Sequence, residues 1–362
     1  MPLEITDPKE LAPFSCNYTA NVPELLMKLK CSLVISTYQA GKVIFLSPKN
    51  EDHLIQLPRT FNKPMGISFL EHSNKMALAS KDEVIVFADS SDLAYSYPKK
   101  RNTYDALYMP RTTYFTGPLD IHDLSWGENG LYAVNTLFSC IVIIDDNYNF
   151  TPVWKPPFIK ELKSEDQCHL NGLVMMNQKP KYATAFNQGN SFQSWRDGVT
   201  TEGVLIDIDT NEVIAGNLRM PHSPRLINNQ LYMLFSATGE VVKVDPLNGT
   251  YEVVTRLTGF VRGMAYYKDF LFVGLSKLRQ NSSTFAKLEI AKKSLNAGIA
   301  IIHLPTGSFY GEIKYHTSVD EIYDVQVLPG KIRPNILNTI QPEHKTGLSI
   351  PESTFWACTD SI

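Results

Sequence analysis

The sequence predicts an all-β protein, a six-bladed β-propeller closed by pairing of its N- and C-terminal strands. Helical periodicity is scarce, and most of the chain alternates short apolar runs with Gly, Asn, Asp and Pro, which is typical of strands and turns. A short motif recurs six times, and in most units three further apolar runs follow it. Four strands per unit, at intervals of roughly 40–60 residues, indicate propeller blades.

Each copy of the motif is interpreted as the innermost strand of a blade. The copies are PMGISF (64–69), IHDLSW (121–126), HLNGLV (169–174), HSPRLI (222–227), VRGMAY (261–266) and IYDVQV (322–327). The sixth unit stops after this strand. The N-terminal region has the complement, three apolar runs within residues 32–58 with no first strand before them. One blade is therefore predicted to be split between the termini, which leaves no unpaired sheet edge. The alternative fold, an open β-sandwich, would not explain why the N- and C-terminal regions supply complementary parts of one blade.

Three regions are expected along the chain. Residues 1–30 form an N-terminal arm that ends in a short amphipathic helix, PELLMKLK (23–30). Residues 31–330 form the six-bladed propeller. Residues 331–362 form a C-terminal tail whose segment PESTFWACT is expected to be a packed strand.

Composition narrows the class of protein. With a net charge of −3 and a pI near 6.3, the chain lacks the excess of basic residues that is typical of nucleic-acid-binding proteins. The start of the chain does not resemble a signal peptide, and no apolar run reaches membrane-spanning length. The five cysteines show no CxxC spacing. We therefore expect a cytoplasmic protein that binds neither nucleic acid nor membrane, and the oligomeric state is left open.

Side chains at the starts of the innermost strands are expected to converge at one mouth of the central channel. The six units are aligned on the column Gly66, Asp123, Gly172, Arg225, Gly263 and Asp324. Three residues earlier stand Lys63, Asp120, His169, His222, Phe260 and Glu321. One residue earlier stand Met65, His122, Asn171, Pro224, Arg262 and Tyr323. The two earlier columns differ by two residues, so on a strand they point the same way.

Three of the eight histidines fall at the starts of consecutive blades. His122, His169 and His222, with Glu321, are predicted to bind a divalent transition metal (Fe, Mn, Zn or Cu), because neutral imidazoles and a carboxylate suit these ions. Asp120, Asp123 and Asp324 would orient the rings. The alternative is that the histidines hydrogen-bond to carbonyl groups and tie neighbouring blades together.

Other polar residues at the same mouth are candidates for substrate binding and acid–base chemistry. The predicted catalytic residues are Tyr38, Arg225, Arg262 and Tyr323. The predicted ligand-binding residues are Gln39, Asn135, Asn171, Lys277 and Arg279. Arginine offers bidentate hydrogen bonds to carboxylate, phosphate or sulfate groups, although salt bridges at the rim would use the same residues.

Several long motifs carry a resemblance to a known family. They include SLVISTYQAGK (32–42), MPRTTYFTGPLDIHDLSW (109–126), CHLNGL (168–173), PHSPR (221–225) and VGLSKLR (273–279). In these, the chain resembles an uncharacterised, mainly bacterial family that is predicted to form propellers. The resemblance spans about residues 24–330 and implies a shared site but no reaction. The sequence departs from the family's pattern near residues 186–203, the segment that contains Trp195 and Arg196.

Two classes of function follow. The first is a metal-dependent enzyme of lyase, epimerase or oxygenase type, acting on a polar, anionic small molecule, sugar acid or modified peptide at the channel mouth. The second is a non-catalytic propeller that binds a peptide or glycan with the same face. The fold alone does not decide between them.

Overall fold

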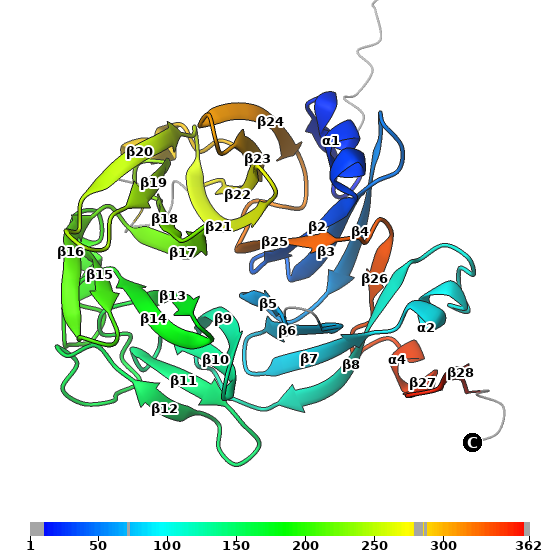
Figure 1. Cartoon of the computed structure of the whole chain (residues 1–362), viewed down its shortest axis with the longest axis horizontal. Coiled ribbons are helices and arrows are strands. Elements are labelled where there is room, and N and C mark those ends of the chain that lie inside the picture. The colour runs from blue at the N-terminus through cyan, green and yellow to red at the C-terminus, as the bar shows by residue number, and fades with distance from the viewer. Residues whose placement is uncertain (1–10, 71–72, 279–284, 286–287, 358–362) are drawn as a thin grey trace, which may run out of the picture.

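The computed structural model describes residues 11–70, 73–278, 285 and 288–357. Six sheets stand around a central channel like the blades of a propeller (Figure 1). In each sheet one strand lies innermost, and the following strands run outward in an antiparallel meander. The all-β, six-bladed fold expected from the repeated motif is therefore confirmed.

Five blades are continuous in the chain. The first contains β5 (Ile67–Phe69), β6 (Lys75–Ala79), β7 (Val84–Asp89) and β8 (Ala106–Tyr114). The second contains β9 (Ile121–Gly127), β10 (Gly130–Asn135), β11 (Cys140–Ile144) and β12 (Thr151–Trp154). The third contains β13 (Leu170–Met176), β14 (Lys179–Ala185), β15 (Gly203–Asp207) and β16 (Glu212–Leu218). The fourth contains β17 (Pro221–Ile227), β18 (Gln230–Phe235), β19 (Glu240–Val244) and β20 (Tyr251–Arg256). The fifth contains β21 (Phe260–Tyr267), β22 (Phe270–Ser276), β23 (Ala297–His303) and β24 (Ser308–Tyr315).

The sixth blade is built from both ends of the chain, as the complementary halves predict. The N-terminal region supplies β2 (Cys31–Thr37), β3 (Lys42–Pro48) and β4 (Leu54–Thr60), and the C-terminal region supplies the innermost strand β25 (Asp324–Pro329). β2 and β25 are antiparallel, with Ser32 opposite Leu328 and Ser36 opposite Asp324. This pairing closes the ring.

The segments outside the ring add to individual blades. β1 (Cys16–Tyr18) pairs with β24, in a stretch that the sequence suggested to be a loose arm. β26 (Pro334–Ile336) pairs in parallel with β8. The predicted tail strand is β28 (Ser353–Trp356), which forms a hairpin with β27 (Gly347–Ile350). The remaining elements are α1 (Asn21–Leu29), α2 (Ser91–Tyr95), α3 (Trp195–Gly198), η1 (Glu289–Lys292) and α4 (Glu343–Thr346). The boundaries of the three expected regions remain a prediction.

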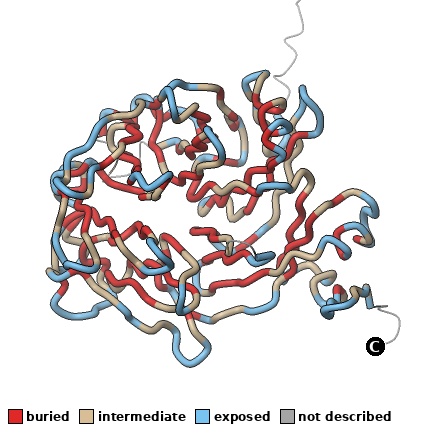
Figure 2. The backbone as a smooth tube through the Cα atoms, viewed as in Figure 1, coloured by how far each residue is buried: buried red, intermediate tan, exposed pale blue. Residues whose placement is uncertain are grey.

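The core lies between neighbouring blades, where sheets pack face to face (Figure 2). Strands in the middle of a blade are covered on both faces, so they are apolar almost throughout rather than alternating. All seven residues of β2 are buried. The helix α1 adds an apolar stripe, including Val22 and Leu26, to the cluster that contains Ile299 of β23.

Candidate functional site

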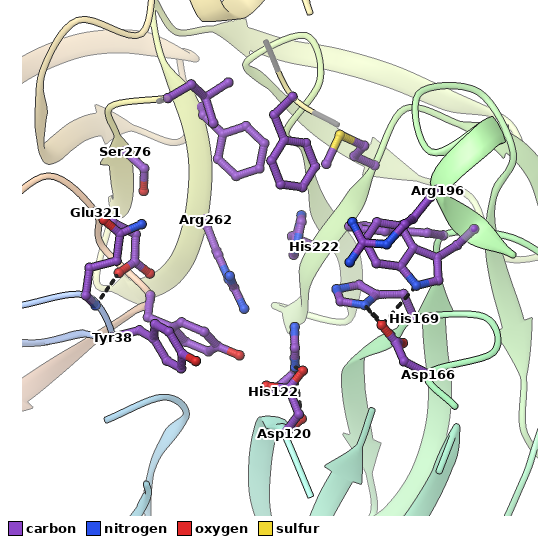
Figure 3. Close-up of a pocket in the computed structure, with 18 of the residues that line it drawn as sticks. Tyr38, Asp120, His122, Asp166, His169, Arg196, His222, Arg262, Ser276 and Glu321 are labelled. Atoms are coloured by element: carbon purple, nitrogen blue, oxygen red, sulfur yellow. Dashed lines mark hydrogen bonds and ion pairs between the residues drawn. The ribbon is translucent and has the colours of Figure 1, made fainter. Parts of the chain in front are cut away.

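A cavity of about 470 Å³ opens at one mouth of the channel. It is lined mainly by residues that begin innermost strands or lie in the loops beside them. The lining side chains are Tyr38, Gln39, Asp120, His122, Asp166, His169, Phe186, Gln193, Trp195, Arg196, Met220, His222, Phe260, Arg262, Ser276, Lys277, Leu278, Phe285, Glu321 and Tyr323. Figure 3 shows His122, His169, His222 and Arg262 pointing into this cavity from different blades.

Local backbone features aim these side chains at the axis. Lys63, Asp120 and His169 stand at the same place in three consecutive blades, and all three adopt left-handed backbone conformations, with φ of 48°, 53° and 51°. The pairing of β9, β13, β17 and β21 with their neighbouring strands also shifts register near the aligned column. Such bulges redirect side chains and are frequent beside active sites.

His122 is held through its Nδ1 atom. This nitrogen lies 3.0 Å from the carbonyl oxygen of Asp120 and 2.8 Å from Oγ1 of Thr136. The Thr136 hydroxyl donates its own hydrogen to the carbonyl oxygen of Leu170, so it accepts from His122. Nδ1 therefore carries the hydrogen, and the lone pair of the neutral ring is on Nε2.

His222 is held in the same way in the fourth blade. Its Nδ1 atom lies 2.7 Å from Oγ of Ser236, and that hydroxyl donates to the carbonyl oxygen of Val261 in the next blade. The hydroxyl again accepts from the ring, which leaves the lone pair on Nε2. Thr136 and Ser236 thus connect the histidines to neighbouring blades, as the alternative hypothesis expects, without using the Nε2 atoms.

His169 is held by a carboxylate and by aromatic rings. Its Nδ1 atom lies 3.0 and 3.1 Å from the two carboxylate oxygens of Asp166. The indole nitrogen of Trp195 donates to the same carboxylate at 2.9 Å. The imidazole ring stacks on Phe186, with ring centroids 4.5 Å apart, and lies 4.4 Å from the centroid of Trp195. The ring orientation is therefore fixed from three sides.

Burial favours the neutral form of His122 and His222 by lowering the pKa of each ring. The pKa of His122 is lowered from 6.5 to about 3, mainly by burial and to a smaller extent by His169 and the positive charge of Arg262. Burial, and then Arg262, also hold the pKa of His222 well below its usual range. His122 and His169 lie with their ring centroids 4.7 Å apart. A neutral His122 at this short range avoids the repulsion that two imidazolium ions would suffer.

The opposite wall is a stack of two tyrosine rings with a cationic side chain at each end. The guanidinium carbon of Arg262 lies 3.4 Å from the ring centroid of Tyr323. The rings of Tyr323 and Tyr38 are stacked with centroids 6.1 Å apart, and Nζ of Lys63 lies 4.9 Å from the centroid of Tyr38. Burial raises the pKa of Tyr323 well above 10, so its hydroxyl carries a proton at neutral pH.

Glu321, the fourth predicted metal ligand, lies on this same wall. Its carboxylate accepts a hydrogen bond of 3.2 Å from the backbone nitrogen of Gln39. Figure 3 shows it beside Tyr38, on the other side of the cavity from His169. In the part of the chain that the structure describes, no group of three or more His, Cys, Asp or Glu side chains is arranged to hold a metal ion.

Arg225 lies below the cavity, in the floor of the channel. Its Nη1 atom is 2.8 Å from a carboxylate oxygen of Asp123, and its Nη2 atom is 3.9 Å from Asp324. The carboxylates also accept backbone hydrogen bonds from the next blade, at Leu173 and Ile67 respectively. The predicted catalytic Arg225 does not line the pocket, and its charge is paired with two buried carboxylates.

Glycines make room for this floor. The aligned column alternates around the ring between glycine (Gly66, Gly172, Gly263) and charge (Asp123, Arg225, Asp324). A Cβ atom on Gly263 would lie 2.8 Å from the Cα of Asp324, and one on Gly172 would lie 2.3 Å from the ring of Pro224. The glycines thus let the neighbouring charged strands approach the axis.

The remaining predicted ligand-binding residues divide between the pocket and its surroundings. Gln39 and Lys277 line the pocket. Asn135 is fully buried and accepts from the backbone nitrogen of Phe138. Asn171 accepts from the Thr184 hydroxyl and borders a second, small cavity beneath the histidines. Arg279 lies outside the described residues.

Some important residues were not predicted from the sequence. Asp166, which orients His169, stands three residues before it, and this Asp-x-x-His spacing is a signal that could have identified it. Phe186 gave no such signal, because its stacking on His169 depends on the end of the neighbouring strand β14.

The fold and the pocket define a class, a six-bladed β-propeller with a cavity at one channel mouth that is lined by both polar and aromatic side chains. The chain belongs to the family described as "Domain of unknown function (DUF4915)", whose model matches residues 20–337. This agrees with the resemblance to an uncharacterised family, and the correspondence of individual motifs remains a prediction. No curated protein matches the sequence.

Among solved structures, the chain is similar to one titled "Crystal structure of Nidogen/Laminin Complex". The sequences are 12% identical, the TM-score is 0.54, and the match covers 83% of this chain and 99% of that chain. At this identity the likeness shows the fold alone. Within the described residues, no helix is long and apolar enough to cross a membrane.

Proposed function

We propose that the protein is an enzyme that acts on a polar, anionic small molecule in the channel-mouth pocket, assisted by a divalent transition metal. The observation that carries the proposal is the common state of His122, His169 and His222. Each ring is fixed through Nδ1, which leaves Nε2 as the nitrogen available to a ligand in the pocket. In His122 and His222, whose pKa values are lowered, this nitrogen carries the lone pair.

The chemistry of these donors fits a transition metal. A ligating imidazole must be neutral, and it usually donates its other ring N–H to a carboxylate, carbonyl or hydroxyl group. All three rings are held through Nδ1, and His122 and His222 also have lowered pKa values that favour the neutral form. Fe, Mn, Zn or Cu suit imidazole donors. Glu321 remains a predicted ligand, although its carboxylate is engaged with Gln39 on the opposite wall.

The protein's own side chains would bind the substrate and move its protons. Arg262 and Lys277 offer positive charge to an anionic group. The protonated hydroxyl of Tyr323 is a candidate proton donor, and Tyr38 stacks against it. A bound metal would supply a Lewis acid that stabilises negative charge on the substrate. Lyase, epimerase and oxygenase reactions are all compatible with these groups.

The location proposed for this activity is the cytoplasm. The four cysteines among the described residues are free thiols, which suits a reducing compartment.

Elemental analysis of the purified protein tests the proposal. We expect a stoichiometric transition metal in the wild type and its loss in the His122→Ala, His169→Ala and His222→Ala variants, with the propeller still folded by circular dichroism. His316→Ala is the control, because His316 is exposed and lies outside the pocket. A wild type that takes up no metal after incubation with Fe, Mn, Zn or Cu would contradict the metal role.

A second candidate is non-catalytic recognition of a small molecule, peptide or glycan by the same pocket. The observation in its favour is the positive charge of Arg262, which lowers the pKa of His122 and His222 and opposes a metal cation for the same electrostatic reason. Ligand binding without any metal requirement would favour this candidate.

A further inference from the structure

The guanidinium of Arg262 is presented to the pocket in an unusual way. Within the described residues it has no hydrogen-bond or ion-pair partner, and it stacks on the ring of Tyr323 in a cation–π contact. Arg225, one blade away, is by contrast paired with Asp123. A guanidinium has five N–H donors in one plane, and stacking on a ring covers its face while leaving these donors at its edge.

The stack behind Arg262 limits its movement. Tyr323 is buried and packs on Tyr38, and Tyr38 is in turn contacted by Lys63, whose Nζ lies 3.1 Å from the Tyr38 hydroxyl. Three residues from three separate segments thus hold one arginine. A donor group that is oriented before binding loses less entropy when its ligand arrives.

The charge around the pocket favours a singly charged ligand. Its lining contains three cationic side chains (Arg196, Arg262 and Lys277) and three carboxylates (Asp120, Asp166 and Glu321). Asp166 is engaged with His169 and Trp195, and Lys277 lies 3.8 Å from Asp320. An oriented, unpaired guanidinium in a pocket with no net formal charge suits a planar monoanion better than a dianionic phosphate.

We propose that Arg262 binds the carboxylate of the substrate through two parallel hydrogen bonds, and that Tyr323 is a positioning residue that holds the guanidinium flat for this purpose. The substrate class is therefore a carboxylic acid. This inference rests on the proposed function, since it concerns the ligand of the same pocket.

Binding of simple probes tests the substrate class. Acetate and benzoate are titrated into the full-length protein at low ionic strength by isothermal calorimetry, beside acetamide and inorganic phosphate. We expect the carboxylates to bind more tightly than acetamide or phosphate. The Arg262→Gln variant should weaken carboxylate binding by about tenfold or more, because a charge-assisted bidentate pair is lost. Arg256→Gln is the matched control, since Arg256 pairs with Glu240 outside the pocket.

Two variants of Tyr323 test the positioning role. Tyr323→Leu removes the ring and should weaken carboxylate binding, whereas Tyr323→Phe keeps the ring and should restore it. Thermal unfolding establishes that each variant is folded. Equal binding of acetate and acetamide, tighter binding of phosphate, or unchanged binding by Arg262→Gln would overturn the inference. Metal analysis of the same samples is independent, so metal uptake without carboxylate binding would contradict only this inference, and the reverse would contradict only the metal role.

Discussion

At the scale of single residues, the pocket depends on which atom of each side chain the protein uses. The Nδ1 atoms of His122 and His222 donate hydrogen bonds to hydroxyl groups, and these hydroxyl groups donate in turn to carbonyl oxygens of the next blade. The fold therefore fixes the tautomer of these rings as well as their position. The sequence showed that three histidines share one face, but it carried no information about which nitrogen would face the pocket.

A comparison of two buried tyrosines tests how much the hydrogen bond of a buried hydroxyl group contributes to stability. The hydroxyl of Tyr323 has no hydrogen-bond partner within the described residues, whereas that of Tyr315 donates to Gln56 at 2.9 Å. Tyr315→Phe should lower the free energy of unfolding by about 1 kcal/mol, because a hydrogen bond is lost. Tyr323→Phe should not lower it in ligand-free protein. Urea unfolding measures both, and an equal loss in the two variants would mean that the Tyr323 hydroxyl is hydrogen-bonded, for example to a water molecule.

At the scale of elements, the innermost strands supply residues to the pocket and, a few positions further along, to the floor of the channel. The aligned columns group Asp120, His122, His169, His222, Arg262 and Tyr323, and in the structure these residues line one cavity. They did not separate the pocket from its floor, so Arg225 and Asn171 were grouped with the pocket residues. The reason is that shared register identifies a common face, whereas depth along the channel depends on local bulges and on the left-handed turns at residues such as His169.

A pair of glycine variants tests how the floor is built. Gly263 and Gly330 have nearly the same backbone conformation, with φ of 77° and 73°, but only Gly263 lies against a neighbouring strand. Gly330→Ala should cost about 1 kcal/mol of unfolding free energy, from the left-handed conformation alone. Gly263→Ala should cost about 1–3 kcal/mol more, because the new methyl group meets the backbone of Asp324. Chemical denaturation measures the difference, and equal losses would show that close approach is not the constraint.

At the scale of the whole molecule, closure is the property that the sequence predicted best. The terminal halves were complementary in strand count, and the observed pairing of β2 with β25 follows from them. The contributions of β1 and β26 were less predictable. Both are three-residue strands, which are too short to show a periodic pattern and are specified by the exposed blade edges that they cover.

Two truncations test the contribution of closure. A chain that ends at Asp320 lacks β25, so it should lose its single cooperative thermal transition and tend to aggregate through the exposed edge of β2. A chain that ends at Leu337 keeps β25 and β26, so it should still unfold cooperatively, although at a lower temperature because the contact between Trp356 and Ser96 is lost. Differential scanning calorimetry distinguishes the two. A cooperative transition in the shorter chain would show that the ring does not depend on closure.

The alternation of glycine and charged residues in the channel floor is consistent only with an even number of blades. Each charged residue stands between two glycine strands, and this arrangement can be continued around a circle only when the number of blades is even. A five- or seven-bladed relative would have to place two glycines or two charged residues side by side, which leaves either a gap or a steric conflict at the axis. The repeating unit of the floor is therefore a pair of blades, one with glycine and one with a charged residue at the aligned position.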